Sequence, residues 1–246
     1  LKFQALQKRS RLDPKRATMK QMKQIECILA EAETVKAILI TSNLRLVVSI
    51  AKKFNDPSHS FDELISIDNL ETGKIFFSGF ANVINAARKC PKIIIGRVQG
   101  KAVGGGVGMA SAVDYCMATK FASVKLSELA VGIGPFVVGP AVERKIGTSA
   151  MSQLSINATE WQTAQWAKEK GLYTEVFETV EEMDEAIAKL TTTLSKSNPE
   201  AMQMLKKVFW EGTEHWDNLL IERAAMSGKL VLSDFTRQAI NKFKKK

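Results

Sequence analysis

The chain has 246 residues, 45% of them hydrophobic and 25% charged, which is enough apolar material for one large domain or a domain with a smaller appendage. No apolar run approaches the roughly eighteen residues of a membrane-spanning helix, and the first thirty residues are basic and polar, so we expect neither a membrane span nor a secretory signal. The three cysteines are far apart and form no C-x-x-C pair, which favours reduced thiols in a cytoplasmic protein over disulfides or a zinc site.

The net charge of +9 is concentrated near the N-terminus, where residues 1–60 carry twelve Lys and Arg against five Asp and Glu. A basic segment of this kind could meet nucleic acid, membrane lipid or a phosphorylated ligand, or it could be a solvated surface. Because no pattern of interleaved aromatic residues accompanies the basic ones, we favour the solvated surface and do not expect nucleic acid as a partner.

The N-terminal quarter predicts an alternation of helix and strand. Residues 1–12 show no clear period and are expected to form an irregular arm. Residues 13–33 place Met and Ile at helical spacing, and residues 35–40 read as a strand. Residues 43–54 fit a helix, and the turn residues at 55–59 then break the chain.

The middle of the chain continues this α/β pattern. Ser60 and Glu63 form a capping box for a short helix, and residues 70–89 predict a longer one with an apolar face. The β-branched run 93–95 predicts a buried strand, and the glycines at 104–106 predict the start of a helix.

The remainder becomes helical toward the C-terminus. We expect a sharp loop that exposes an aromatic residue over 132–136, a helix over 159–170 and a strand over 172–177. From residue 181 the pattern is helical, with new helices starting at Asn198–Pro199 and at Ser233–Asp234. The sequence therefore predicts an α/β core over residues 1–190 and a helical C-terminal region over residues 191–246.

The glycine run Gly104, Gly105 and Gly106 is the first candidate binding motif. The position that would complete a G-x-G-x-x-G dinucleotide motif is Met109, and no Gly-Lys-Ser/Thr triplet of a P-loop follows. Two interpretations remain open: a site where backbone N–H groups at a helix N-terminus bind an oxyanion, or close packing of a helix.

Glu128 is the second candidate, because it stands between Leu126 and the apolar run 129–131. Burial of a carboxyl group raises its pKa and suits it to proton transfer near neutral pH. The alternative is a glutamate that caps a helix or forms an ion pair. The two histidines, His59 and His215, are far apart, and no Ser-His-Asp or metal-ligand spacing is present.

Over about residues 13–42 and 60–246, the chain resembles the crotonase (enoyl-CoA hydratase/isomerase) family. The segments that carry the resemblance are SFDEL, IIIGRVQGKAVGGGVGMASAVDYCMAT, ASVKLSELAVGIGP and INATEWQTAQWAKEKGL. Their specific features are A-x-G-G-G, an Asp nine residues after the central glycine, and a correctly spaced Ser-Glu pair. Residues 43–54 instead resemble a helix of bacterial sigma factors, so residues 43–59 are atypical for the family.

The resemblance implies an α/β fold, a crotonase-like spiral of ββα units with two near-perpendicular sheets and a helical C-terminal trimerisation region. It implies an acyl-CoA thioester as the substrate, with coenzyme A as part of that substrate and with no separate cofactor and no metal. It also implies a homotrimer or a hexamer.

The resemblance further assigns roles to individual residues. Glu128 matches the residue that transfers the proton, the N–H of Gly105 matches one oxyanion donor, and His59 stands at the position of the second donor. The residues expected to line the substrate pocket are Gly104, Gly106, Gly108 and Pro135.

Family hydratases usually carry two glutamates, and here Gly108 stands at the first place while Glu128 matches the second. Two carboxylates suit the addition of water, because one activates the water and the other delivers a proton. One carboxylate is enough to move a proton between two carbons. The first expectation from the family is a 2-enoyl-CoA hydratase; the alternatives are a single-glutamate isomerase or decarboxylase, and a non-catalytic CoA-binding or scaffold relative.

Overall fold

The computed structural model describes residues 67–244. The elements predicted before residue 67 lie outside the described residues, as does His59. In the described part no helix is both long and apolar enough to cross a membrane.

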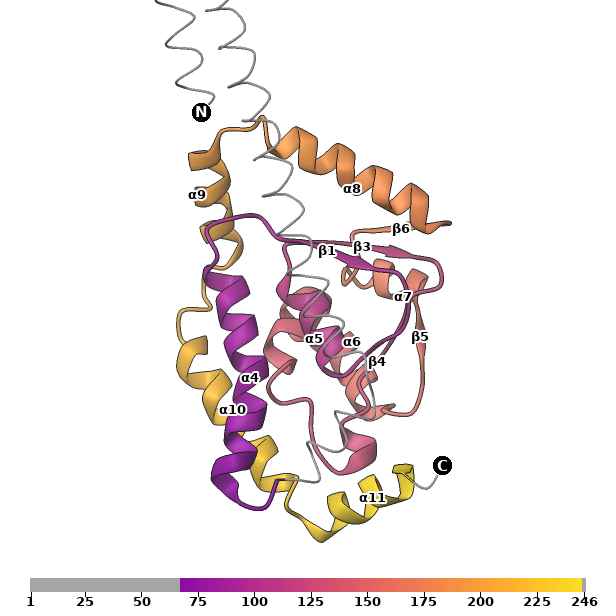
Figure 1. Cartoon of the computed structure of the whole chain (residues 1–246), viewed down its shortest axis with the longest axis vertical. Coiled ribbons are helices and arrows are strands. Elements are labelled where there is room, and N and C mark those ends of the chain that lie inside the picture. Colours follow the sequence, from indigo (N-terminus) through magenta and orange to yellow (C-terminus); the bar gives the residue numbers. More distant parts are fainter. Residues whose placement is uncertain (1–66, 245–246) are drawn as a thin grey trace, which may run out of the picture. The chain divides into compact units, whose positions relative to one another are not determined.

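Within residues 67–244, the strands form two small three-stranded sheets (Figure 1). In the first sheet the strand order is β1-β3-β6 and all pairs are parallel; in the second it is β2-β4-β5, with β2 parallel and β5 antiparallel to β4. The strands are β1 (Ile95–Val98), β2 (Ala102–Val103), β3 (Tyr115–Thr119), β4 (Ser123–Lys125), β5 (Gln162–Thr163) and β6 (Glu175–Phe177).

Helices make up most of the rest. They are α4 (Leu70–Lys89), α5 (Gly105–Ala112), α6 (Gly139–Ile156), α7 (Ala164–Glu169), α8 (Val180–Leu194), α9 (Pro199–Phe209), α10 (Trp216–Leu230) and α11 (Asp234–Lys244), with a short 3-10 helix, η1 (Leu129–Val131), between β4 and α6. One parallel and one mixed sheet, both small and joined by many helices, are the α/β arrangement that the sequence predicts.

Several predicted helices are confirmed because their ends have local signals. The helix expected over 70–89 is α4, which begins after a capping box formed by Asn69 and Thr72. The helix start at Asn198–Pro199 is also confirmed, since the Asn198 side chain accepts hydrogen bonds from the N–H groups of the first turn of α9.

The strand expected over 93–95 is wrong in its position, because β1 begins at Ile95. The N–H of Ile94 donates to the side chain of Asp114, Oδ2, at 2.8 Å, and the Ile94 carbonyl accepts from the N–H groups of Asp114 and Tyr115. A side chain therefore replaces the strand partner at this point, and regular pairing starts one residue later at Ile95 with Tyr115.

The helix expected over 159–170 is also wrong at its start. Gln162 and Thr163 pair with β4 instead, and the Thr163 hydroxyl caps α7 by accepting from the N–H of Trp166 at 3.1 Å. The strand expected over 172–177 is shortened to β6, and the N–H of Thr174 donates to the Cys116 carbonyl at 2.7 Å just before that strand.

The loop over 132–136 is irregular as predicted, but its aromatic residue is not exposed. Phe136 is half-buried, and its ring folds back over Gly134, where a Cβ atom would lie 2.3 Å from the ring. The absence of a side chain at Gly134 is what allows this contact.

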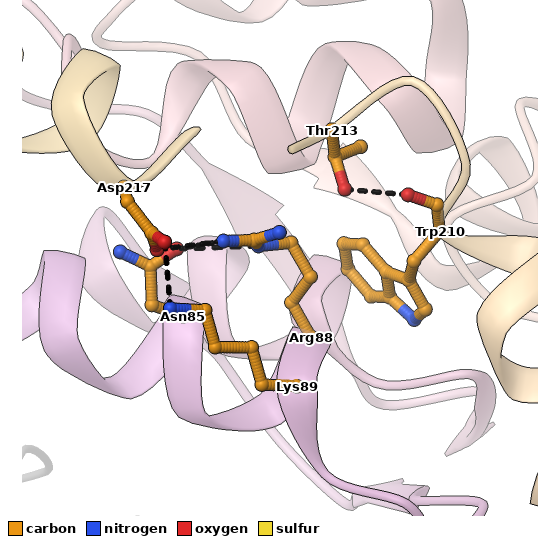
Figure 2. A network of polar contacts seen from close by, with 6 residues as sticks. All are labelled: Asn85, Arg88, Lys89, Trp210, Thr213 and Asp217. Carbon is orange, nitrogen blue, oxygen red and sulfur yellow. Dashed lines mark hydrogen bonds and ion pairs between the residues drawn. The ribbon is translucent and has the colours of Figure 1, made fainter. Parts of the chain in front are cut away.

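The main core joins the sheets to α4, α5, α6 and α10, and α4 and α10 lie side by side (Figure 1). Near one end of this pair the backbones touch, because a Cβ on Gly73 would lie 2.8 Å from the Gly228 carbonyl oxygen. Near the other end Asp217 accepts from Arg88 and from Lys89, each at 2.7 Å (Figure 2). The two helices are therefore antiparallel and are held at both ends.

Helices that follow residue 190 contribute to the same core. Trp210 and Trp216 are buried and meet edge to face, with ring centroids 6.0 Å apart. Thr213, in the connection between α9 and α10, donates its hydroxyl proton to the Trp210 carbonyl at 2.6 Å (Figure 2). A domain boundary near residue 190 stays a prediction.

Candidate active site

The N-terminus of α5 presents backbone N–H groups in the way that an oxyanion site requires. The Gly104 N–H donates to the Lys125 carbonyl at 2.9 Å, which ties the glycine run to β4. The Gly104 carbonyl accepts from Val107 and Gly108 at 2.9 and 3.2 Å. Within residues 67–244 no acceptor receives the N–H groups of Gly105 and Gly106, so both are free to bind a negatively charged oxygen.

Gly104 has a backbone conformation that suits glycine. Its φ is +51° and its ψ is −113°, a region in which side chains are strained. This conformation turns the chain from the strand β2 into the helix α5, so the turn depends on a glycine at this position.

The carboxylate of Glu128 lies directly against this turn. A Cβ atom on Gly104 would be 2.9 Å from Glu128 Oε1. The other oxygen, Oε2, is buried and has no hydrogen-bond partner within the described part of the chain. Because burial of an ionised carboxylate without a partner is unfavourable, the proton is held more tightly.

Burial accordingly raises the pKa of Glu128 to about 7, and its own backbone N–H offsets a smaller part of this shift. A carboxyl group with this pKa is present in both protonation states near neutral pH. It can therefore accept a proton and return it without a large free-energy cost.

The two alternative roles for Glu128 find no support among residues 67–244. Its side chain makes no capping hydrogen bond to η1, and no lysine, arginine or histidine of this part of the chain forms an ion pair with it. Its backbone is held instead, because the Glu128 carbonyl accepts from Val131 at 3.2 Å and from Ile133 at 2.9 Å.

The C-terminal helix α11 supports the turn that follows Glu128. At Gly132, whose φ is +85°, a Cβ would lie 2.5 Å from the ring of Phe235 and 2.6 Å from the Thr236 hydroxyl. Thr236 is fully buried. The last helix of the chain thus packs on the segment that positions the carboxylate.

The glycine run packs closely against α4 at Gly105, as the packing interpretation predicts. A Cβ on Gly105 would lie 2.3 Å from the ring of Phe80 in α4, so the ring covers this glycine. Phe80 also meets the Phe76 ring edge to face, with centroids 6.3 Å apart. Gly105 therefore packs closely against α4, its role as an N–H donor stays a prediction, and Phe80 is a neighbour of the candidate site that sequence reasoning missed.

The other predicted pocket residues lie in different surroundings. A Cβ on Gly106 would make only an ordinary contact, 3.7 Å from the Ala102 Cβ. Gly108 faces the buried side chain of Val138, and Pro135 lies in the loop before α6, where its carbonyl accepts from Gly139 at 2.8 Å. The structure thus brings Gly104, Gly105 and Glu128 together.

Asp114, the aspartate of the family pattern, lies at the other end of α5. Its carboxylate accepts from Lys206 at 2.6 Å and from the indole Nε1 of Trp210 at 2.9 Å, and the Asp114 and Lys206 side chains are each only 2% exposed. This buried pair ties α9 to the start of β3. No sequence signal pairs these residues, because 92 positions separate them.

A cavity of about 280 Å³ adjoins this ion pair, lined by Asp114, Arg144, Lys145 and Phe209. Burial lowers the pKa of Lys145, whose Nζ donates to the Asp114 carbonyl at 3.2 Å. Since Asp114 follows the C-terminus of α5 and Glu128 lies at its N-terminus, this cavity is separate from the candidate active site.

Comparison with solved structures identifies the class of fold. An enoyl-CoA hydratase from Mycobacterium avium superposes with a TM-score of 0.67 at 23% identity, over 72% of this chain and 69% of that one. The protein thus has the α/β crotonase fold. A sequence model of the enoyl-CoA hydratase/isomerase family matches residues 60–245, and the chain belongs to that family.

Curated relatives include dienoyl-CoA isomerases. The peroxisomal Delta(3,5)-Delta(2,4)-dienoyl-CoA isomerase of Arabidopsis thaliana is 26% identical over 64% of this chain and 57% of that protein. The mitochondrial enzyme of the same name from Homo sapiens is 33% identical over 52% of this chain and 39% of its own length. The chain therefore spans between two fifths and three fifths of the length of these relatives.

Proposed function

We propose that the protein acts on an acyl-CoA thioester and that Glu128 moves a proton between two carbons of the acyl chain, as in an enoyl-CoA isomerase. The observation that carries this proposal is the contact of the buried Glu128 carboxylate with the Gly104 turn, directly before the N–H groups of Gly105 and Gly106. Within residues 67–244 the Glu128 Oε2 atom and these two N–H groups have no hydrogen-bond partner. Coenzyme A enters as part of the substrate, and no other cofactor is needed for this chemistry.

The chemistry follows from the geometry. The ionised Glu128 removes a proton from the carbon next to the thioester carbonyl, and the electron pair of the C–H bond moves to the thioester oxygen as an enolate forms. The Gly105 N–H donates to that oxygen as its negative charge develops, and removal of one such donor costs roughly 3 kcal/mol in known oxyanion holes. Glu128 then returns the proton to the γ-carbon, so the double bond moves by one position.

His59 is proposed as the second donor of this oxyanion site. It lies outside the described residues, so its role rests on the resemblance alone. Pro135, Gly104, Gly106 and Gly108 keep their proposed place around the acyl group on the same basis.

Hydration of a 2-enoyl-CoA, the first expectation from the sequence, is the second candidate. The family includes hydratases by its description, but the position of their first glutamate is Gly108 in this chain. Isomerisation is better supported because one carboxylate suffices and because the relatives described above carry the name isomerase. A decarboxylase and a non-catalytic CoA-binding relative are the remaining alternatives.

Two assays with the full chain separate these functions. A 3-enoyl-CoA should be converted to the conjugated 2-enoyl-CoA, while crotonyl-CoA should lose little of its enoyl thioester absorbance. Glu128→Gln should lower the isomerisation rate by about 10²–10⁴-fold, whereas the exposed Glu169→Gln should not. Fast loss of crotonyl-CoA absorbance would instead establish the hydratase, and binding of CoA without turnover would establish the scaffold.

A homotrimer is proposed as the assembly, or a hexamer built from trimers. Helix α9 exposes a row of apolar side chains to solvent. Its members are Met204, Leu205, Val208 and Phe209. An apolar row of this kind on a C-terminal helix is typical of a surface that another subunit covers. Sedimentation analysis of the wild type and of Val208→Glu tests this, because the charge should shift the mass toward the monomer.

A further inference from the structure

The side chain of Val138 occupies the space into which a side chain at position 108 would point. A Cβ on Gly108 would lie 2.4 Å from Val138 Cγ1 and 2.7 Å from Val138 Cβ. Real Cβ atoms essentially never come this close to a non-bonded atom. Since the Cβ of a valine is part of its branch point, a rotation about χ1 moves the methyl groups but not this atom.

The surroundings of Val138 leave it little room to retreat. Its side chain is 5% exposed, and it belongs to the same core cluster as Val107 and Ala110 of α5. Its backbone precedes α6, and its carbonyl accepts from the N–H of Val142 at 3.0 Å. Gly108 and Val138 therefore form a small–large pair in which the valine fills the volume that the glycine leaves.

We infer that Val138 is a specificity-determining residue that keeps a second carboxylate, and the water it would activate, out of position 108, one helical turn after the Gly104 that Glu128 contacts. This inference rests on the proposed function, because it concerns which reaction the thioester site favours. With the Val138 side chain at this place, the part of the chain from 67 to 244 supplies one acid–base group to the site, Glu128, and proton transfer between carbons is favoured over addition of water.

Whether Val138 fills the space beside Gly108 is tested by a double-mutant cycle of melting temperatures, which requires no enzyme assay. Gly108→Ala should lower the melting temperature by roughly 3–10 °C, because overpacking a filled core is destabilising. Val138→Ala should open space, so that the double variant Gly108→Ala/Val138→Ala melts at or above the temperature of Val138→Ala alone. Val137→Ala is the matched control, because Val137 is equally buried but is not the residue that a Cβ on Gly108 meets, and it should not compensate.

The effect of Val138 on reaction specificity is tested by placing a glutamate at position 108. Gly108→Glu alone should yield little folded protein, whereas Gly108→Glu/Val138→Gly should fold. The double variant should raise the ratio of crotonyl-CoA hydration to 3-enoyl-CoA isomerisation at least tenfold over Val138→Gly. A purely structural role of Val138 would restore folding without changing this ratio.

The outcomes separate the two proposals. If no variant and no wild-type preparation turns over an acyl-CoA, the proposed function fails, and the folding cycle still decides whether Val138 fills position 108. The inference is overturned if Gly108→Ala is as stable as the wild type, if Val137→Ala compensates as well as Val138→Ala, or if the folded double variant isomerises with an unchanged ratio.

Discussion

The Oε1 atom of Glu128 lies 2.9 Å from the point where a Cβ on Gly104 would stand. The carboxylate is therefore in contact with the turn that starts α5. The contact is at Gly104, and the next residue, Gly105, carries the N–H group of the proposed oxyanion site. This contact places the carboxylate beside the N–H group that we propose as an oxyanion donor. The same turn is tied to β4, because the N–H of Gly104 donates to the carbonyl of Lys125.

Gly104→Ala should strain the turn before α5 and displace the carboxylate of Glu128. The φ of +51° strains any side chain at this position by about 1–3 kcal/mol, and the new Cβ would displace Oε1. We expect a lower free energy of unfolding and a large loss of the proposed isomerase activity. Gly106→Ala is the control for stability, because its Cβ would make only ordinary contacts and alanine is the better helix former. Equal stability of the two variants would contradict the strain at Gly104.

The ionisation of Glu128 should make the stability of the protein depend on pH. Its pKa is raised from 4.5 to about 7 in the folded state, so the folded protein binds the proton more tightly than the unfolded chain does. The stabilisation is fully present below about pH 4.5 and is lost as the pH rises through about 7, an effect on the order of 3 kcal/mol. Glu128→Gln should remove this dependence. Urea unfolding of both proteins between pH 5 and pH 8.5 measures it, and parallel curves would exclude the raised pKa.

The same pKa should appear in the kinetics. Because the first step needs the ionised carboxylate, kcat/KM for a 3-enoyl-CoA should fall about tenfold per pH unit below the pKa of about 7 and should level off above it. A profile that is flat from pH 5.5 to pH 9 would show that another group accepts the proton.

Lys206→Met should destabilise the protein far more than Lys120→Met. Both lysines form ion pairs at 2.6 Å, but the Lys206–Asp114 pair is buried, while the Lys120 and Glu178 side chains are 48% and 70% exposed. Removal of Lys206 leaves the buried Asp114 with an unpaired charge, which costs about 3–5 kcal/mol, whereas an exposed pair contributes about 0–1 kcal/mol. Chemical denaturation measures both, and similar losses would argue against a buried charge at Asp114.

Gly228→Ala should weaken the contact of α4 with α10. Its Cβ would lie 2.7 Å from the backbone of Gly73 and Lys74, atoms that cannot move aside as a side-chain tip can. We expect a loss of about 1–3 kcal/mol of stability. Gly79→Ala in α4 is the matched control, because nothing lies within 4 Å of its Cβ, and it should stabilise the helix by about 0.5–1 kcal/mol. If both substitutions stabilise the protein, the two helices do not touch at Gly73.

The sequence predicts the long helices well because their information is local. Helix α4 runs from Leu70 to Lys89 as expected, since an apolar face of helical period identifies its length and a capping box determines its start. The short strands were poorly predicted or missed. Strands of two to five residues are determined by their partners, and β5 exists because Gln162 and Thr163 meet β4.

For the candidate site, too, local features could be predicted from the sequence, but contacts between distant residues could not. By itself the sequence identifies Glu128 as a carboxylate among apolar residues, the glycine run as a helix start, and the family through the spacing of both. Only the tertiary structure decides that Glu128 Oε1 rests on Gly104, that Phe80 covers Gly105 and that Val138 fills the space beside Gly108. These contacts join residues far apart in the chain, and their distances depend on how α4, α5 and α6 pack, which no local pattern of residues encodes.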